Sequence, residues 1–360
     1  MKKSYSILAA LLLGLGSCTE SYIDEIIKKD PGPDVTAPVV NISFPLDGTK
    51  IRVVEDVTAI DINLEVVDDI EIASIQLKLN NAEIASFNDF RDYRRAVKSF
   101  RYTNLGNGPH VLEVIAKDLS GKTTSKSVNF EKVEPYRPQF AGEIFYLPFD
   151  GDNMELVNIK TPTVSGSPSF ANGLKGKAYA GATNAYLTFP TAGLLSSEFS
   201  AAFWYKVNAS PDRAGILVIG PPDPNNPNNM NNRRNGFRLF RENAGGKQRI
   251  KLNVGTGASD NWFDGGAAAD IDPAAGEWVH VAFTISSSSC AVYLNGNVVS
   301  QGNFAGVDWT GCNILTIASG APRFTEWGHL SDGSLFDELR LFNKALTPVE
   351  IQGIIQTDKP

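Results

Sequence analysis

Strict alternation of apolar and polar side chains is the feature that most limits how this chain folds. In Ile60-Asp61-Ile62-Asn63-Leu64-Glu65-Val66 every second residue is apolar, and Ile75-Gln76-Leu77-Lys78-Leu79 repeats the pattern. Successive side chains of a strand point to opposite faces, so a period of two predicts strands with one buried face. Similar short runs, separated by turn residues such as Asn80-Asn81, extend from about residue 38 to 131. We therefore predict an antiparallel β-sandwich in this part of the chain.

A second β-rich region follows a short linker that contains Pro135 and Pro138. Its short apolar runs are richer in intervening glycine and asparagine, and Asn295-Gly296 between two apolar pairs is a strong hairpin signal. Only the C-terminus is typical of a helix, since Thr347 and Glu350 are spaced as a capping box. A chain of 360 residues suits two domains of this kind, so the predicted fold class is all-β.

Motifs in both regions resemble known families. Asp34-Val35-Thr36-Ala37-Pro38-Val39 and the stretch from Gly108 to Asp118 are similar to bacterial immunoglobulin-like modules. The second region resembles the laminin-G-like, concanavalin A-type jelly-roll domains of Bacteroidetes surface proteins. Six motifs carry this second resemblance in the family's order: Leu147-Pro148-Phe149-Asp150-Gly151, Gly176-Lys177-Ala178-Tyr179, the strand from Phe199 to Lys206, Gly276-Glu277-Trp278-Val279-His280-Val281-Ala282, Val292-Tyr293-Leu294-Asn295-Gly296, and the run from Phe336 to Thr347. The resemblances imply an N-terminal immunoglobulin-like β-sandwich followed by a concanavalin A-like/laminin-G-like jelly-roll sandwich.

The N-terminus predicts export and lipid attachment. Lys2 and Lys3 precede a short apolar run, which is too short to span a bilayer as a helix but is typical of a secretory signal. Leu15-Gly16-Ser17-Cys18 resembles the lipobox of bacterial lipoproteins, which implies that Cys18 is acylated. The alternative is an ordinary secretory signal with a chance cysteine. The predicted boundaries are a lipoprotein signal peptide at 1–17, a tether at 18–36, an immunoglobulin-like domain at 37–133, a linker at 134–141 and a jelly-roll domain at 142–357.

The composition limits the partners. The formal net charge of −7 argues against a nucleic-acid binder, because such proteins normally carry a basic domain. Acidic residues soon after the lipobox cysteine resemble the surface-export signal of Bacteroidetes lipoproteins. We therefore expect a lipid-anchored protein of the outer membrane that faces the cell exterior.

Nothing in the jelly-roll region predicts catalysis. Glucanases of this fold use two carboxylates that share one cleft, which on a strand requires acidic residues at alternating positions. No such run occurs between 140 and 360, and Asp337 and Glu338 are adjacent, so they point to opposite faces. His280 lies within an apolar strand motif and is interpreted as structural. We predict that the protein is not an enzyme.

The resemblance to laminin-G-like domains implies a structural Ca²⁺ site. The acidic residue after the first strand and the one in the Phe-Asp-Glu strand often hold calcium in that family, and Asp150 and Asp337 match these positions. Calcium requires six to eight oxygen ligands, of which loop carbonyls supply part. The alternative is that both carboxylates accept hydrogen bonds from turn or strand-end amides.

Glycan binding is predicted from aromatic residues among polar neighbours. Sugar rings stack their C–H faces on exposed aromatic rings, while a few polar groups fix their orientation. Trp204 and Trp278 lie in apolar strands and are predicted to be in the core. The candidate glycan-binding residues all lie in segments predicted as loops: Trp262, Trp327, Trp309, Asn261, Arg323, Arg233 and Arg234. Each tryptophan has the alternative of capping a sandwich edge.

Arg233 and Arg234 end the most unusual stretch of the chain, the proline- and asparagine-rich residues 221–235. Long loops on rigid sandwiches often carry function, and two arginines could bind carboxylates or sulfates of an acidic glycan. The alternative is a mobile, solvated insertion that binds nothing.

Two cysteines remain besides Cys18. Cys290 and Cys312 lie at or near the starts of two apolar strands, and an oxidising envelope would allow a disulfide between them. The alternative is two buried, unpaired thiols.

These features predict a non-catalytic, cell-surface, carbohydrate-binding lipoprotein that captures glycan for a polysaccharide-utilisation system. Its expected partners are a polysaccharide or oligosaccharide, the outer-membrane lipid held through Cys18, an outer-membrane importer and glycanases. The alternative is a structural or adhesive surface protein that binds a protein or a host matrix component.

Overall fold

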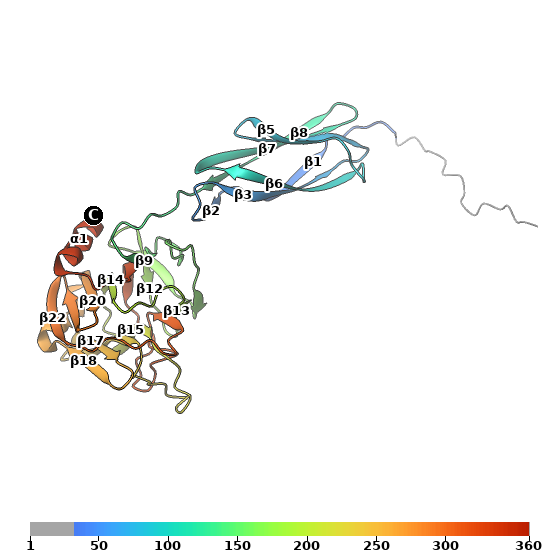
Figure 1. Cartoon of the computed structure of the whole chain (residues 1–360). Helices are drawn as coiled ribbons and strands as arrows, with labels where there is room; N and C mark the ends of the chain where they lie inside the picture. The colour runs from blue at the N-terminus through green and yellow to red at the C-terminus, as the bar shows by residue number, and fades with distance from the viewer. Residues whose placement is uncertain (1–31, 360) are drawn as a thin grey trace, which may run out of the picture. The chain divides into compact units, whose positions relative to one another are not determined.

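A computed structural model describes residues 32–359 of the chain (Figure 1). Cys18, the predicted signal peptide and the first part of the predicted tether lie outside the described residues. No helix within 32–359 is both long and apolar enough to cross a membrane. The chain divides into two compact units. One contains Asp61–Tyr102, His110–Phe130 and the described residues up to Gly48, and the other contains Glu131 onward together with Thr49–Ile60 and Thr103–Pro109.

Residues 39–132 form eight strands in two sheets. The strands are β1 (Val39–Phe44), β2 (Thr49–Ile51), β3 (Thr58–Val67), β4 (Ile72–Leu79), β5 (Ala82–Phe87), β6 (Arg95–Leu105), β7 (Gly108–Asp118) and β8 (Thr123–Lys132). One sheet has the order β1-β3-β6 and the other the order β2-β8-β7-β4-β5. The alternating residues Ile60, Ile62, Leu64 and Val66 are buried, so the period-two pattern is confirmed. That this sandwich is immunoglobulin-like stays a prediction.

The C-terminal part forms two larger sheets. Its elements are β9 (Glu143–Leu147), β10 (Thr163–Ser165), β11 (Ser169–Asn172), β12 (Lys177–Ala180), β13 (Tyr186–Pro190), β14 (Phe199–Lys206), β15 (Arg213–Ile219), β16 (Phe237–Ala244), β17 (Lys247–Gly255), β18 (Asp260–Asp264), β19 (Asp270–Ile271), β20 (Val279–Ile285), β21 (Ser289–Leu294), β22 (Asn297–Asn303), β23 (Ile314–Ile317), β24 (Leu335–Phe342), α1 (Pro348–Asp358) and the 3₁₀ turns Gly266–Ala269 and Pro273–Ala275. The front sheet has the order β10-β13-β23-β15-β16-β17-β18, with β19 paired to β17. The back sheet has the order β11-β12-β24-β14-β20-β21-β22, with β9 paired to β24.

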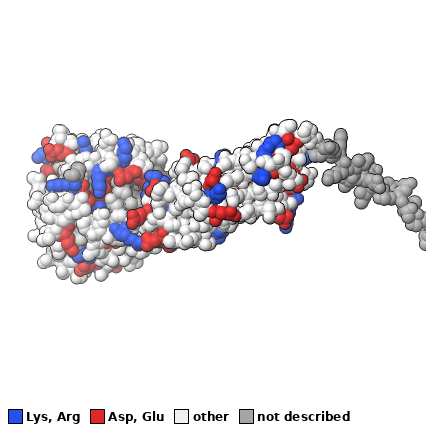
Figure 2. Space-filling model, turned by 90° about the horizontal axis from the view of Figure 1, so that it is seen from above, with Lys and Arg blue, Asp and Glu red and all other residues white. Residues whose placement is uncertain are grey.

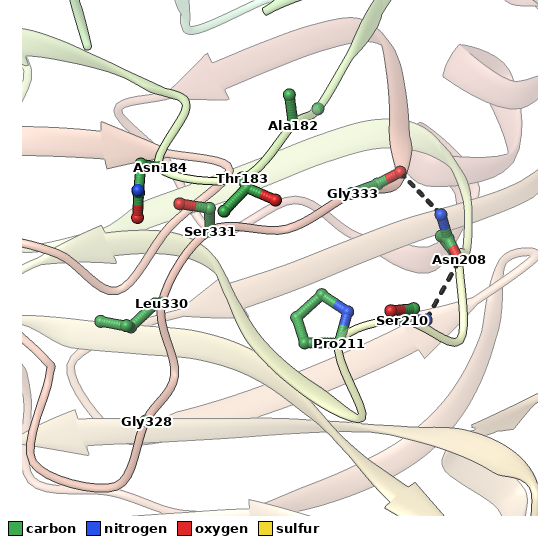
Figure 3. A pocket seen from close by; sticks show the side chains of 11 residues that line it. Ala182, Thr183, Asn184, Asn208, Ser210, Pro211, Gly328, Leu330, Ser331 and Gly333 are labelled. Carbon is green, nitrogen blue, oxygen red and sulfur yellow. Dashed lines mark hydrogen bonds between the residues drawn. The ribbon is translucent and has the colours of Figure 1, made fainter. Parts of the chain in front are cut away.

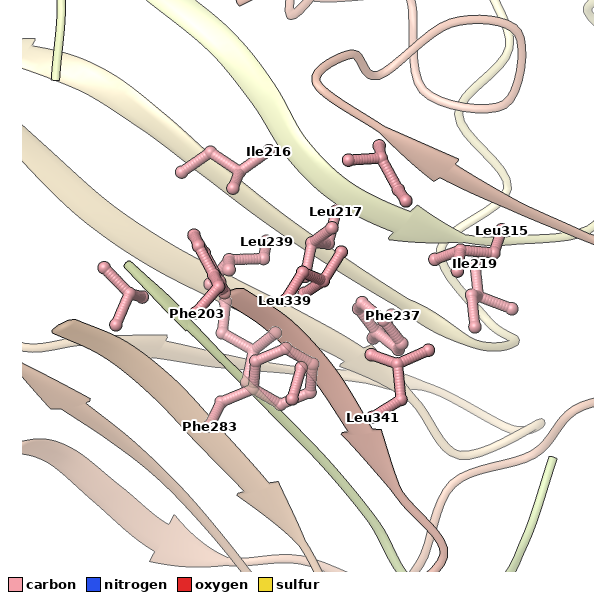
Figure 4. Close-up of a cluster of buried hydrophobic side chains, with 14 of the residues drawn as sticks. Phe203, Ile216, Leu217, Ile219, Phe237, Leu239, Phe283, Leu315, Leu339 and Leu341 are labelled. Carbon is pink, nitrogen blue, oxygen red and sulfur yellow. The ribbon is translucent and has the colours of Figure 1, made fainter. Parts of the chain in front are cut away.

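The two sheets pack face to face around one apolar core. Figure 4 shows Phe203, Phe283 and Leu341 from the back sheet together with Phe237 and Leu315 from the front sheet. These side chains are fully buried. At about 25 cal/mol per Å² of buried apolar surface, such a core is the main stabilising contribution to a sandwich. The predicted all-β sandwich fold is therefore confirmed.

The outer face of the back sheet is covered by α1. Along β14, Ala201 and Phe203 point into the core, whereas Ala202 and Trp204 pack on the opposite face against Ile351 and other residues of α1. The helix begins as predicted, because the Thr347 side chain caps it in a capping box with Glu350. The apolar cluster between the back sheet and α1 contains both Trp204 and Trp278, in line with their predicted core positions.

The outer face of the front sheet is different, because loops rather than a helix cover it. In β16, Phe237 and Leu239 face the core, and the intervening strand positions place Arg238 and Phe240 on the outer face. Charged residues of both signs are interspersed over the surface shown in Figure 2. The outer face of the front sheet holds the candidate site.

Candidate functional site

The proline- and asparagine-rich loop, residues 221–235, is held against the front sheet by one buried arginine. Arg238 is fully buried and donates hydrogen bonds to the carbonyl oxygens of Asn235, at 2.9 Å, and of Asn232. Its removal from water lowers the pKa of Arg238 to about 10. A buried cation that donates to several loop carbonyls fixes the path of the loop, because each of these groups would otherwise lose its partner.

A second segment, residues 320–333, lies beside this loop. The N–H of Thr325 donates to the carbonyl of Met230 at 2.8 Å, and the N–H of Met230 donates to the Thr325 hydroxyl at 3.0 Å. Asn231 also donates to the Glu326 carboxylate. The loop is therefore paired with segment 320–333 and anchored to the sheet, and it is not a free solvated insertion in this structure.

One group of side chains on the outer face of the front sheet is called the aromatic cluster. It consists of Trp262, Trp327 and Arg233. The rings of Trp262 and Trp327 are nearly parallel, with centroids 5.9 Å apart and planes at 27°. The Arg233 guanidinium carbon lies 5.6 Å from the centroid of Trp262 and 4.9 Å from that of Trp327. Trp262 is 44% exposed. Three of the predicted glycan-binding residues thus come together from three separate segments.

Trp262 is not in a loop as predicted. It lies on β18, the edge strand of the front sheet, opposite Asn253 of β17. The polar residues around it suggested a loop, but Phe263 is buried and Trp262 is exposed, which is the alternation of a strand. The same alternation turns the Asn261 side chain to the face opposite Trp262, so Asn261 does not join the aromatic cluster.

Buried aromatic rings support the cluster from below. Phe240 lies edge-on to Trp262 with centroids 6.0 Å apart, and Phe324 lies edge-on to Trp327 at 5.6 Å. His329 stacks on Phe324 at 4.8 Å, and its Nε2 is 3.0 Å from Oε1 of Glu242. Burial lowers the pKa of His329 to about 4, although the Glu242 carboxylate opposes the shift. The support therefore carries a neutral imidazole at pH 7.

A polar hollow of about 670 Å³ opens beside the cluster. Asparagine, arginine and aspartate side chains of residues 223–234 and 258–260 line it, among them Arg234 and Asp260. Arg233 belongs to both the hollow and the aromatic cluster, and its Nε lies 3.8 Å from Oδ2 of Asp260. Exposed aromatic faces beside amide and guanidinium groups provide both kinds of contact that a sugar uses.

Two other predicted residues lie apart from the cluster. Trp309 packs against the main core, and its indole N–H donates to the carbonyl of Ser196 at 2.7 Å. Arg323 is half-buried and donates to Oδ1 of Asn313 at 3.0 Å. Both side chains hold loop ends in place instead of facing the hollow.

Asp150 and Asp337 lie at the two ends of one glycine turn. Oδ2 of Asp337 accepts the N–H groups of Leu174, at 2.7 Å, and of Lys175, at 3.1 Å. Oδ1 of Asp150 accepts the N–H of Lys177 at 2.9 Å. Gly176 approaches Asp150 so closely that a Cβ atom on it would lie 2.0 Å from Oδ1.

The buried Asp337 carboxyl has one unsatisfied oxygen. Its Oδ1 has no hydrogen-bond partner within the described part of the chain. Burial raises the pKa of Asp337 to about 7, and the charges of Glu338 and Asp150 act in the same direction. No group of three or more His, Cys, Asp or Glu side chains among residues 32–359 is arranged to hold a metal, so a cation here would also need loop carbonyls. A bound cation would give the unpaired oxygen of Asp337 a partner. It would also reduce the repulsion between the two carboxylates.

The predicted disulfide is not formed in the structure. Cys290 and Cys312 are both free and buried. Cys290 lies on β21 of the back sheet, whereas Cys312 precedes β23 of the front sheet, so the two strands are not neighbours. Each thiol packs in the core as an apolar side chain, and burial raises the pKa of Cys312 to about 11.

Sequence reasoning missed the residues that hold the site together. Arg238, Phe240 and His329 are buried under the loops and were not predicted as parts of it. The one usable signal was Phe240, an aromatic residue at a strand position that should face outward. His280, interpreted as structural, is buried edge-on to Trp204 at 5.3 Å, and burial lowers its pKa to about 3.

Comparisons with known proteins agree with the fold of the C-terminal part. The family model of the concanavalin A-like lectin/glucanases superfamily matches residues 181–352. None of the curated proteins compared with the chain matched it.

Solved structures resemble the chain at low sequence identity. Domain 4 of AbnA, a GH43 extracellular arabinanase from Geobacillus stearothermophilus in complex with arabinotriose, has a TM-score of 0.46 and 21% identity over 59% of this chain and 97% of that chain. The binding domain of botulinum neurotoxin DC in complex with SialylT has a TM-score of 0.43 and 11% identity over 60% of this chain and 51% of that chain. The match of the family model, together with the two-sheet sandwich, shows that the C-terminal part of this chain contains a concanavalin A-like domain.

Proposed function

We propose that this protein is a non-catalytic, cell-surface lipoprotein that binds carbohydrate through the outer face of its front sheet. The observation that carries the proposal is the aromatic cluster, in which an exposed Trp262 lies nearly parallel to Trp327 and Arg233 borders both rings. A sugar would stack its C–H face on the exposed indole. Arg233, Arg234 and the asparagines of the hollow would bond its hydroxyl or acidic groups.

The proposal that a lipid anchors the protein to a membrane rests on the N-terminal sequence. Leu15-Gly16-Ser17-Cys18 supports acylation of Cys18, which would tether the protein to the outer membrane with its binding domain facing the exterior. The N-terminal sandwich would serve as an immunoglobulin-like spacer. Captured glycan would pass to glycanases and an importer of a polysaccharide-utilisation system, of the kind known in Bacteroidetes.

A structural Ca²⁺ ion is part of the proposal. Asp150 and Asp337 would hold it, with carbonyl oxygens of the adjoining glycine turn completing the oxygen ligands that calcium prefers. The unsatisfied Oδ1 of Asp337 supports this assignment. The ion would stabilise the turn between β11 and β12 and would take no part in a reaction.

Affinity electrophoresis tests the proposed function. The full chain with Cys18→Ser, which cannot be acylated, is run through gels containing arabinan, galactan, xylan, mixed-linkage β-glucan, polygalacturonate or chondroitin sulfate, with calcium and with chelator. We expect one polysaccharide to retard the protein without being degraded. No retardation in any gel would favour an adhesive protein with a protein ligand, and release of shorter products would indicate an enzyme.

A further inference from the structure

A second pocket, of about 500 Å³, is lined by residues of the concanavalin A-like domain and shares no lining residue with the polar hollow. Figure 3 shows that three loops surround it, with Thr183 and Ser331 on one side and Ser210 and Pro211 on another. Leu330 also lines the pocket and is 44% exposed.

The walls of this pocket are fixed before any ligand arrives. The N–H of Gly181 donates to the carbonyl of Ser334 at 3.0 Å, and Nδ2 of Asn208 donates to the carbonyl of Gly333 at 3.2 Å. Behind them, Asp332 forms a fully buried ion pair with Arg241 at 2.9 Å. A preorganised pocket loses little conformational freedom when it binds, and this favours affinity.

The lining chemistry fits an uncharged sugar. Polar side chains line it, and those of Thr183, Asn184 and Ser210 supply hydroxyl and amide groups that can bond a sugar. Leu330 and Pro211 add apolar surface for a sugar C–H face, and no lining residue is charged. The pocket therefore differs from the arginine-lined hollow.

One segment of chain joins the pocket to the aromatic cluster. Trp327 belongs to the cluster and Leu330 to the pocket, and three residues of chain span at most about 11 Å. Backbone hydrogen bonds fix this segment, since the N–H of Gly215 donates to the carbonyl of Leu330 at 3.1 Å and the N–H of Gly320 donates to that of His329 at 2.9 Å.

We propose that the pocket is a second subsite, for a neutral sugar unit, of one extended glycan-binding surface that begins at Trp262 and Trp327. This inference rests on the proposed function and specifies its ligand: the internal part of a chain of several sugars, not a single terminal sugar.

Binding of oligosaccharides of increasing length tests the proposal. Oligosaccharides of two to eight sugars are prepared from a polysaccharide that retards the protein. Each is titrated calorimetrically into the full chain with Cys18→Ser. We expect affinity to rise with length until both subsites are filled. Leu330→Ala and Thr183→Val should each weaken the longest oligosaccharides about three- to tenfold, as expected for loss of one apolar or hydrogen-bonding contact, and leave the shortest unchanged.

The matched control is Val298→Ala, because Val298 lies on β22 of the back sheet and is 43% exposed. If Leu330→Ala fails to fold, Thr183→Val still tests the proposal, because it only replaces a hydroxyl with a methyl group on an exposed loop. Unchanged affinity of both pocket variants at every length would overturn the second subsite and leave the aromatic cluster as the binding site. Absence of binding by the unsubstituted chain to all six polysaccharides would overturn both proposals.

Discussion

The indole rings of Trp262 and Trp327 lie with their centroids 5.9 Å apart and their planes at 27°. One ring comes from the edge strand β18 and the other from segment 320–333, so the pair exists only when the sheet and the segment are both folded. Arg233 contributes a third group to the same place, at 4.9 Å from the Trp327 centroid. The geometry supports a stacking platform with polar groups at its border.

Arg238 is expected to control the order of the loop next to this platform. Replacing it with methionine removes the charged donor to the carbonyls of Asn232 and Asn235, and such hydrogen bonds contribute about 1.5–3 kcal/mol each to stability. We predict that Arg238→Met lowers the thermal midpoint of the C-terminal domain. Trypsin should cleave the variant after Arg233 or Arg234 at least about tenfold faster, because a loosened loop opens more often.

Arg101→Met is the control for that experiment. Arg101 is exposed and pairs with Asp61 at 3.2 Å in the N-terminal sandwich. Exposed ion pairs contribute about 0–1 kcal/mol, so this variant should keep both the midpoint and the cleavage rate. Equal cleavage of Arg238→Met and the unsubstituted chain would show that Arg238 does not anchor the loop.

Low pH is predicted to destabilise the fold through His329, which lies beneath the aromatic cluster. His329 has a folded pKa of about 4, below the usual 6.5, so the unfolded chain takes up a proton at a higher pH than the folded one. The stability contributed by the neutral ring is fully present at pH 7 and is lost as pH falls from about 6.5 towards 4, by about 1.4 kcal/mol per pH unit.

Chemical denaturation at pH 7.0 and 5.5 tests this linkage. His329→Gln cannot be protonated, so its free energy of unfolding should fall by about 1.4 kcal/mol less than that of the unsubstituted chain over this range. His280, with a folded pKa of about 3, is present in both proteins, and the difference therefore isolates His329. Parallel pH dependence of the two proteins would contradict the prediction.

Calcium is predicted to stabilise the C-terminal domain. A ligand that binds only the folded state contributes about 2.7 kcal/mol at one hundred times its dissociation constant, which is several degrees in the thermal midpoint. Asp337→Asn and Asp150→Asn should each abolish this response. Asp212→Asn, on an exposed side chain, should keep it. If the thermal midpoint of the unsubstituted chain is the same in calcium and in chelator, the proposed Ca²⁺ site is contradicted.

Much of the sandwich architecture could be predicted from residue patterns. The alternation of Ile60 to Val66 fixed which face of β3 is buried, and Asn295-Gly296 marked a hairpin between β21 and β22. Strand β18 was missed because Trp262 lies among polar residues, which at a sheet edge are as compatible with a strand as with a loop. Local patterns also could not tell that Cys290 and Cys312 belong to different sheets.

The candidate site was predicted only in part for a related reason. The polar neighbours of Trp262, Trp327 and Arg233 made them candidates, but sequence could not show that the three side chains meet, since their contacts depend on long-range pairing. The same criterion selected Trp309, whose ring reaches back to Phe199 and Phe237 in the core. Polar neighbours along the chain do not determine the direction of a side chain.

The most direct test of the central proposal is retention of Trp262→Ala in the gel that retards the unsubstituted chain. Phe170→Ala is the matched control, since Phe170 is 38% exposed on β11 of the back sheet. We predict that Trp262→Ala still folds cooperatively but loses about 2 kcal/mol of binding free energy, a reduction in affinity of about thirtyfold, as is typical of a central aromatic anchor. Phe170→Ala should be retarded as strongly as the unsubstituted chain. Full retardation of Trp262→Ala would contradict the assignment of the aromatic cluster as the glycan-binding site.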